Sequence, residues 1–128
     1  MDITVRSSRR NEMIDITLQV NEAIRSTGKT QGLCFIFVPH TTAAVTINEN
    51  ADPDVQKDIL TTLSRVFPQD LAHAHGEGNS DAHIKSSLVG ASETVAIDQG
   101  RLVLGTWQSV FFCEFDGPRT RKVLVRII

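Results

Sequence analysis

Histidine is concentrated in one short stretch of this sequence. His73, His75 and His83 are three of its four histidines and fall within eleven residues. The fourth, His40, directly follows Pro39. A neutral imidazole binds zinc well, and a catalytic zinc commonly has three protein ligands and one open position. His40, His73 and His83 form such a set if the stretch folds back over the strand near His40. A solvated, histidine-rich loop is the alternative interpretation.

Two carboxylates lie among these histidines. Glu77 and Asp81 can each orient an imidazole ring and fix its tautomer, or hold Mg²⁺ against phosphate oxygens. An exposed loop charge is the alternative for Glu77. A positioned His83 or Asp81 can also transfer protons. We therefore predict three catalytic residues and a divalent metal, zinc or magnesium. The predicted catalytic residues are His83, Asp81 and Glu77, and the predicted metal ligands are His40, His73 and His83.

A short motif after these histidines favours an anion. Residues 83–87 read HIKSS, near the start of a helix that we predict over Ile84–Val89. The amides at a helix N-terminus attract negative charge, and Lys85 and Ser86 add a cation and a hydroxyl. The alternative is a solvated first helical turn. Thr41 and Thr42, which follow His40, can add two hydroxyl donors. The predicted anion-binding residues are therefore Thr41, Thr42, Lys85 and Ser86.

Strands must position these residues from both ends of the chain. Alternating, β-branched and aromatic runs predict strands over residues 3–6, 13–16, 33–38, 42–47, 94–97, 102–104, 110–115 and 122–127. The first two strands follow each other closely and predict a hairpin. The continuous apolar run of 33–38 predicts a strand buried on both faces.

Helices are expected between the strands. A helix over 18–27 has Thr17 as its N-cap and Gly28 as its stop. An amphipathic helix over 54–66 has Asp52 as its N-cap, followed by a proline in the first turn. Strands at both ends with helices between them favour an α+β fold, an antiparallel β-sandwich-like core with two to three packed helices. We expect Trp107 to belong to the core.

Length and composition exclude several classes of protein. The chain has 128 residues, which predicts a single domain over 1–128. A net charge of −2 gives no basic field for nucleic acid or an anionic membrane. No apolar run reaches the roughly 20 residues that span a bilayer. Met1–Arg10 is mixed and charged, unlike a secretory signal, and both cysteines lie in apolar runs that predict buried free thiols. We therefore expect a cytoplasmic protein.

Four segments together resemble the YjbQ-like family, also called the secondary thiamine-phosphate synthase family. They are ITVRSS at 3–8 with the helix that follows it, PHTTAAVTINENADPDV at 39–55, HGEGNSDAHIKSSLVG at 75–90 and GRLVLGTWQSVFFCEFDGPR at 100–119. They cover nearly the whole chain in the family's order. His73, Glu77, Asn79 and His83 fit the family pattern. Relatives commonly have a carboxylate at the position of His75 and a histidine at that of Asp81.

The resemblance implies a β-sandwich, a homotrimer and a site at or near the subunit interface. It also implies a ligand that carries phosphate. In that ligand site, Arg119 of the DGPR turn would clamp the phosphate, because a planar guanidinium can bind two oxygens at once. Members of the family have been linked to thiamine phosphate synthesis as a secondary activity.

Three functions are compatible with these residues. The first is an enzyme that acts on a phosphorylated small molecule, in which a thiazole phosphate nitrogen displaces diphosphate from a pyrimidine methyl diphosphate. The second is a metal-dependent hydrolase or transferase with metal-bound water as the nucleophile. The third is a binding protein for a metal or a phosphorylated ligand. The sequence has no Walker loop, no G-x-S-x-G elbow and no G-x-G-x-x-G motif.

Overall fold

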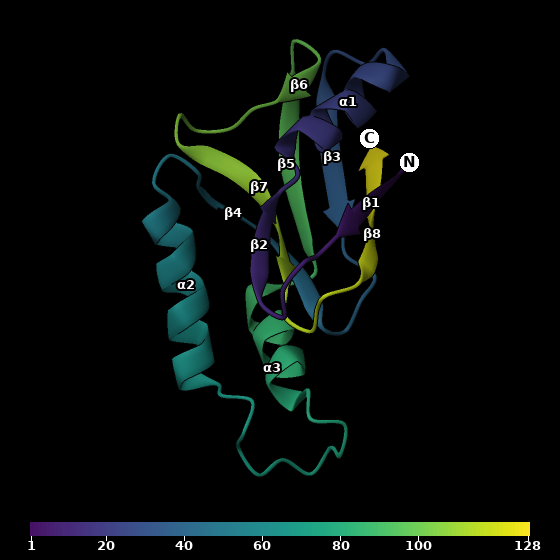
Figure 1. The fold of residues 1–128 in the computed structure, drawn as a ribbon. Coiled ribbons are helices and arrows are strands. Elements are labelled where there is room, and N and C mark those ends of the chain that lie inside the picture. Colours follow the sequence, from purple (N-terminus) through teal and green to yellow (C-terminus); the bar gives the residue numbers. More distant parts are fainter.

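The computed structural model describes residues 1–128 (Figure 1). The elements follow in the order β1 (Asp2–Arg6), β2 (Glu12–Asp15), α1 (Thr17–Thr27), β3 (Gly32–Phe37), β4 (Ala43–Glu49), α2 (Pro53–Val66), α3 (Ser80–Val89), β5 (Ser92–Asp98), β6 (Arg101–Leu102), β7 (Gln108–Glu114) and β8 (Thr120–Ile127). No helix combines the length and the apolar character needed to cross a bilayer.

The strands form two antiparallel sheets. The large sheet has the order β1-β8-β3-β5-β6, and the small sheet has the order β2-β7-β4. Strands from the two ends of the chain therefore pair in the large sheet, where Asp2 lies opposite Leu124. The predicted α+β class, with an antiparallel sandwich-like core and packed helices, is confirmed.

The main core lies between the two sheets. Alternate residues of each strand point into it, and α1 closes one end, at the top of Figure 1. Each fully buried aliphatic side chain contributes about 1.5–3 kcal/mol by leaving water. The central members are Val20, Ile24, Cys34, Ile36, Val45, Val110, Phe112, Val123 and Val125.

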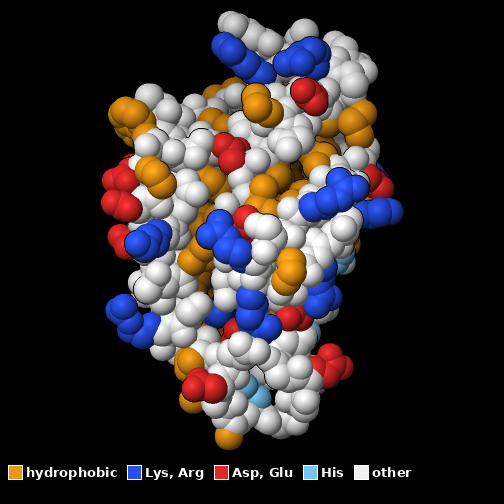
Figure 2. Space-filling model, viewed as in Figure 1, with side chains coloured by type: hydrophobic (Ala, Val, Ile, Leu, Met, Phe, Trp, Pro, Cys, Tyr) orange, Lys and Arg blue, Asp and Glu red, His pale blue; other side chains and the backbone are white.

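A second apolar cluster covers the outer face of the small sheet. It joins Phe111, Cys113 and Phe115 of the β7 region to Ala82 of α3, with Leu63 of α2 packed against it. Although α2 begins with the predicted Asp52 cap, none of its residues is fully buried. An apolar furrow of about 350 Å³ runs between α2 and the sheet, and Figure 2 shows apolar side chains along it. This helix is therefore attached less tightly than the sheets are to each other.

The outer face of the large sheet is uncovered, which corrects the expectation for residues 33–38. Leu33 is 46% exposed, and Phe35 and Phe37 are only partly buried. The rings of Phe35 and Phe37 stack with their centroids 6.3 Å apart. The apolar run is continuous because one face meets the main core and the other forms an exposed apolar stripe.

Two further expectations about local structure were wrong. Strands β1 and β2 form no hairpin, because residues 7–11 carry the chain from the large sheet to the small one. The residue expected to cap α1, Thr17, instead accepts a hydrogen bond from the amide of Val110 at 2.9 Å through its hydroxyl. The N-cap of α1 is Ile16, which makes no capping side-chain bond.

The start of α3 and the place of Trp107 also differ from expectation. The helix begins at Ser80 rather than Ile84. The apolar pattern did not show this start, because the buried side of the first turns contains an ion pair, Asp81 with Lys85. Trp107 is 63% exposed in the β6–β7 connection, where its carbonyl accepts from the amide of Asn50.

Candidate functional site

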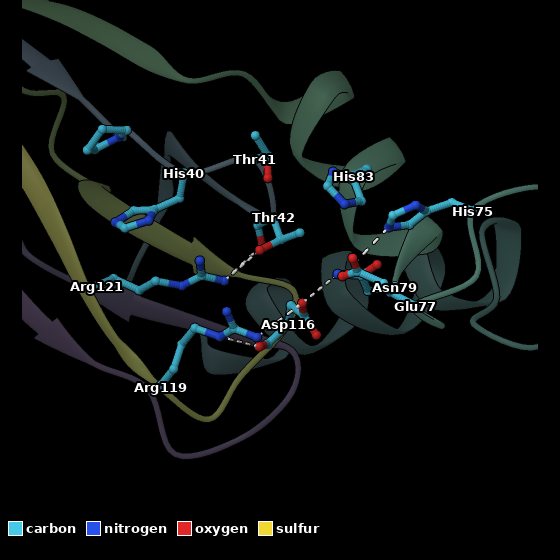
Figure 3. A pocket seen from close by; sticks show the side chains of 11 residues that line it. His40, Thr41, Thr42, His75, Glu77, Asn79, His83, Asp116, Arg119 and Arg121 are labelled. Carbon is cyan, nitrogen blue, oxygen red and sulfur yellow. Dashed lines mark hydrogen bonds and ion pairs between the residues drawn. The ribbon is translucent and has the colours of Figure 1, made fainter.

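A polar depression of about 520 Å³ lies where three connections meet (Figure 3). These are the β3–β4 connection, the loop into α3 and the β7–β8 turn. Apart from one proline ring, every lining side chain is polar or charged, so the depression suits a hydrophilic ligand. Its lining residues are Pro39, His40, Thr41, Thr42, His75, Glu77, Asn79, His83, Asp116, Arg119 and Arg121.

A buried ion pair fixes one wall. Arg121 of β8 binds both oxygens of Glu114 at the end of β7, with a distance of 2.9 Å from Nε to Oε1. The same guanidinium donates to Thr42 Oγ1 at 2.8 Å, and Ser7 donates to Glu114 at 2.8 Å. Glu114 is fully buried and Arg121 is 4% exposed. Because these donors and acceptors satisfy one another, the wall is held in one geometry.

Glu114 stays ionised in this surrounding. Burial by itself raises the pKa of the carboxyl, but the hydrogen bonds from Arg121, from the amide of Asp116 and from Ser7, with the charge of Arg121, lower it below its ordinary value of 4.5. The pair therefore keeps both charges at neutral pH.

His40 is held beside this pair as a neutral ring. Its Nε2 accepts a hydrogen bond from the backbone amide of Lys122 at 3.0 Å. A neutral imidazole has one accepting nitrogen, so Nδ1 carries the proton. Burial, followed by the positive charge of Arg121, lowers the pKa of His40 below its ordinary value of 6.5. His40 therefore presents an N–H donor and not a free lone pair.

Asp116 joins the two halves of the depression. Its carboxylate accepts from Arg10 at 3.2 Å, from Asn79 at 2.9 Å and from Arg119 at 3.2 Å. The Nε of Arg119 also donates to the carbonyl of Asp116 at 2.9 Å. The Arg119 side chain is still 50% exposed, so its guanidinium remains accessible at the rim.

A second buried ion network lies outside the lining. Asp81 and Lys85 are each 1% exposed and lie 3.0 Å apart, and Arg10 contacts Asp81 at 3.0 Å. Lys85 also donates to Asn11 and to Ser64 of α2. Burial raises the pKa of Asp81, but Lys85 and Arg10 together lower it below its ordinary value of 3.8. The network connects α3 to α2 and to the β1–β2 connection.

The loop before α3 forms the opposite wall. The rings of His75 and His83 lie nearly perpendicular, with their centroids 5.4 Å apart. His75 Nε2 is 3.8 Å from a carboxylate oxygen of Glu77, and both of these side chains are well exposed. Asn79 ties this wall to Asp116, whereas His75 and Glu77 extend into solvent.

The structure brings some of the predicted residues together and separates others. His40, Thr41, Thr42, Glu77, His83 and Arg119 line the depression. His73 lies outside the lining, and Asp81 and Lys85 are buried in the second network. The hydroxyl of Ser86 is used within the fold, because it donates to the carbonyl of Thr41 at 2.6 Å. Lys85 and Ser86 are also not at the helix start, since α3 begins earlier.

The three histidines predicted as metal ligands do not fit a preformed site. No group of three or more His, Cys, Asp or Glu side chains is arranged to hold a metal ion. His73 lies outside the depression, and the accepting nitrogen of His40 already binds the Lys122 amide. The bound metal stays a prediction, and the donors nearest to one another are His75, His83 and Glu77.

Sequence reasoning missed three residues that build the walls, Asp116, Arg121 and Glu114, and noted Asn79 only as part of the family pattern. One sequence feature pointed to the pair of Glu114 and Arg121. Glu114 is a lone carboxylate within the apolar run VFFCEF, and a charge in a buried strand requires a partner.

Comparisons with known proteins give a consistent result. Residues 1–128 match the family model described as UPF0047 protein YjbQ-like. The chain is 51% identical over 127 residues to the UPF0047 protein YugU of Bacillus subtilis, which covers 98% of this chain and 96% of that protein. It is 52% identical over 124 residues to a UPF0047 protein of Methanocaldococcus jannaschii, covering 97% and 90%.

Solved structures agree with the fold. An uncharacterised conserved protein of the YjbQ/UPF0047 family from Clostridium acetobutylicum matches with a TM-score of 0.98 and 52% identity, covering 100% of this chain and 99% of that one. A conserved hypothetical protein from Thermus thermophilus matches with a TM-score of 0.94 and 43% identity, covering 100% and 99%.

Proposed function

Because the chain belongs to the YjbQ-like UPF0047 family, we propose that its polar depression binds a phosphorylated small molecule and transfers a group at that site. The observation that carries the proposal is the composition of the depression. Arg119 and Arg121 stand on one side, His83 stands on the other, and no apolar side chain other than a proline lies between them. Accessible guanidinium and hydroxyl donors suit phosphate oxygens.

The proposed reaction is the thiamine-phosphate type of transfer. The ring nitrogen of a thiazole phosphate attacks the methylene carbon of a pyrimidine methyl diphosphate. The new C–N bond forms as the C–O bond breaks, and diphosphate leaves with the electron pair. Arg119 stabilises the charge that develops on the leaving group, and His83 supplies a proton to it. Glu77, whose carboxylate lies 3.8 Å from His75, orients that ring when the ligand binds.

Comparing two histidines tests this assignment. We expect His83→Ala to lose most of the thiamine phosphate formed by wild type, since general acid catalysis typically contributes about 10²–10⁴-fold. His73→Ala is the matched control, because His73 belongs to the same segment but does not line the depression. Full activity in His83→Ala would refute the site. Wild-type protein that binds inorganic phosphate and diphosphate but forms no product would be a binding protein.

A homotrimer is the second part of the proposal, and the exposed apolar stripe supports it. Leu33, Phe35 and Phe37 of β3 lie on the uncovered face of the large sheet, and Leu124 of β8 is opposite Phe37. Monomeric proteins rarely leave such a continuous apolar surface in water. We propose that a second copy of the chain covers it.

The mass of the particle tests the trimer. Light scattering should give three times the chain mass of 14.1 kDa for wild type, and less for Phe37→Glu, which places a charge in the stripe. Thr62→Glu on the exposed side of α2 serves as the control and should leave the mass unchanged. A monomeric wild type would contradict the trimer without affecting the phosphate proposal.

A further inference from the structure

A second depression adjoins the first. Its volume is about 480 Å³, and it shares His40, Thr41 and His83 with the polar depression. These three residues lie along one side of the polar depression in Figure 3, so the two hollows meet at them. The remaining lining residues are Ala43, Ser86, Ser87, Gly90 and Ala91. A ligand that crosses this boundary can occupy both hollows.

The second depression differs from the first in charge. Its lining has no Arg, Lys, Asp or Glu, whereas the first has Arg119, Arg121, Asp116 and Glu77. Its side chains beyond the shared residues are short, so the space is open to a ligand. A Cβ placed on Gly90 would meet no atom within 4 Å.

The two serine hydroxyls of this hollow are already used within the fold. Ser86 donates its proton to the carbonyl of Thr41 at 2.6 Å, and Ser87 donates to the carbonyl of His83 at 2.8 Å. A phosphate oxygen needs donors, and these two are already used. The second depression therefore disfavours the charged group of a ligand, and that group binds in the first depression, which contains Arg119 and Arg121.

The wall behind this hollow is fixed. The carbonyl of Ala91 accepts from the amide of Val38 at 2.8 Å, and that of Gly90 accepts from Val45 at 3.1 Å. These bonds join the end of α3 to β4 and to the residue that follows β3. A preformed surface loses little entropy when it binds a ligand.

We infer that the second depression is a specificity subsite for the uncharged organic group of a phosphate monoester or diphosphate whose charged group binds in the first. The inference rests on the proposed phosphate site and narrows its substrate class to bipartite molecules. Ser87 and Ala91 determine specificity, because both line the second hollow and neither lines the first.

Calorimetry with inorganic phosphate and benzyl phosphate tests the subsite. We expect wild type to bind benzyl phosphate about tenfold more tightly than inorganic phosphate, since a partly buried ring adds favourable transfer free energy. Ser87→Leu and Ala91→Leu fill the second hollow at exposed positions. Each should abolish the preference for benzyl phosphate and leave the affinity for inorganic phosphate unchanged. Thr62→Leu, on the exposed side of α2, should keep the preference.

The possible results separate the two proposals. If wild type binds inorganic phosphate but prefers benzyl phosphate no more than the two leucine variants do, the subsite is refuted and the phosphate site stands. If wild type binds neither compound, the phosphate site is refuted and the subsite falls with it. Two leucine variants at different positions ensure that misfolding of one does not decide the result.

Discussion

The two walls of the polar depression are built in opposite ways. The strand wall contains Glu114 and Arg121, both almost completely buried and bonded to each other, and Arg121 also donates to Thr42. The loop wall contains His75 and Glu77, whose side chains are 46% and 74% exposed. One wall is fixed by paired charges inside the fold, whereas the other contributes side chains that water can reach.

This difference suggests a division of work within the site. The charges of the strand wall are already paired and oriented, so this wall supplies a fixed frame, and the accessible guanidinium of Arg119 at the rim suits phosphate. Segments with few buried contacts open most easily and often carry functional groups, which suits the loop wall to proton transfer and to access.

Removing Glu114 should have the largest effect on stability. Glu114→Ala leaves Arg121 buried without its partner, so the free energy of unfolding should fall by about 3–5 kcal/mol. Urea unfolding followed by circular dichroism measures the change. The control Glu22→Ala, at an exposed position of α1, should stay within about 0.5 kcal/mol of wild type. Equal effects of the two variants would show that the strand wall is not held by its ion pair.

Acid should weaken the same contacts. The folded-state pKa values of Glu114 and Asp81 lie below the ordinary values of 4.5 and 3.8, so the unfolded chain binds these protons first as pH falls. The stability that these carboxylates contribute is complete above the ordinary values and is lost as pH falls through the folded-state values. We expect the urea midpoint to fall from about pH 5 downward. The urea midpoint should fall less steeply with pH in Glu114→Gln than in Glu22→Gln. Equal slopes in the two variants would contradict a stabilising role of the ionised Glu114.

Removing the accessible guanidinium should weaken phosphate binding while the fold stays intact. Arg119→Ala should lower the affinity for inorganic phosphate about tenfold or more, because a hydrogen bond to a charged group contributes about 1.5–3 kcal/mol. Calorimetry measures the affinity, with Arg65→Ala on the exposed surface of α2 as a matched arginine control. The affinity of Arg119→Ala for an uncharged analogue of the ligand should fall much less. Equal losses for neutral and charged ligands would count against the clamp.

Changing the loop wall should hardly affect stability. His75→Ala removes an exposed side chain, so the free energy of unfolding should change by less than about 0.5 kcal/mol. The same urea experiment measures it beside Glu114→Ala. A loss of several kcal/mol would show that the loop wall is as firmly integrated as the strand wall.

Removing metal should have the smallest effect on ligand binding. Since the predicted histidines do not converge, we expect chelator-treated, untagged protein to bind inorganic phosphate with unchanged affinity. Elemental analysis of untreated wild type, His40→Ala and His83→Ala is the companion measurement. Near-stoichiometric metal that both variants lose would establish a metal site and overturn this expectation.

Local sequence patterns predicted much of the fold because local chemistry determines it. Asp52 accepts from the amide of Asp54 at 2.9 Å and begins α2 as expected, and Gly28 ends α1 with a φ of 73°. His40, Thr42 and His83, which the sequence analysis singled out, line one depression, although their roles in it stay predictions.

Local sequence patterns do not predict contacts between distant segments. Arg10 and Asp116 meet only because the β1–β2 connection crosses beside the β7–β8 turn. The first turns of α3 were missed because their buried residues are charged, and apolar periodicity cannot reveal an ion pair. Trp107 was misplaced because an aromatic side chain at a surface connection looks, in sequence, like one in the core.

The loose attachment of α2 has a consequence for how this architecture diversifies. A helix without a fully buried residue, followed by the exposed segment 67–79, can accept altered sequences without disturbing either sheet. Grafting that segment from one relative onto another would exchange side chains that line the polar depression while the two sheets stay the same. The two sheets then form a constant framework, and relatives can differ in the side chains that segment 67–79 contributes to the depression.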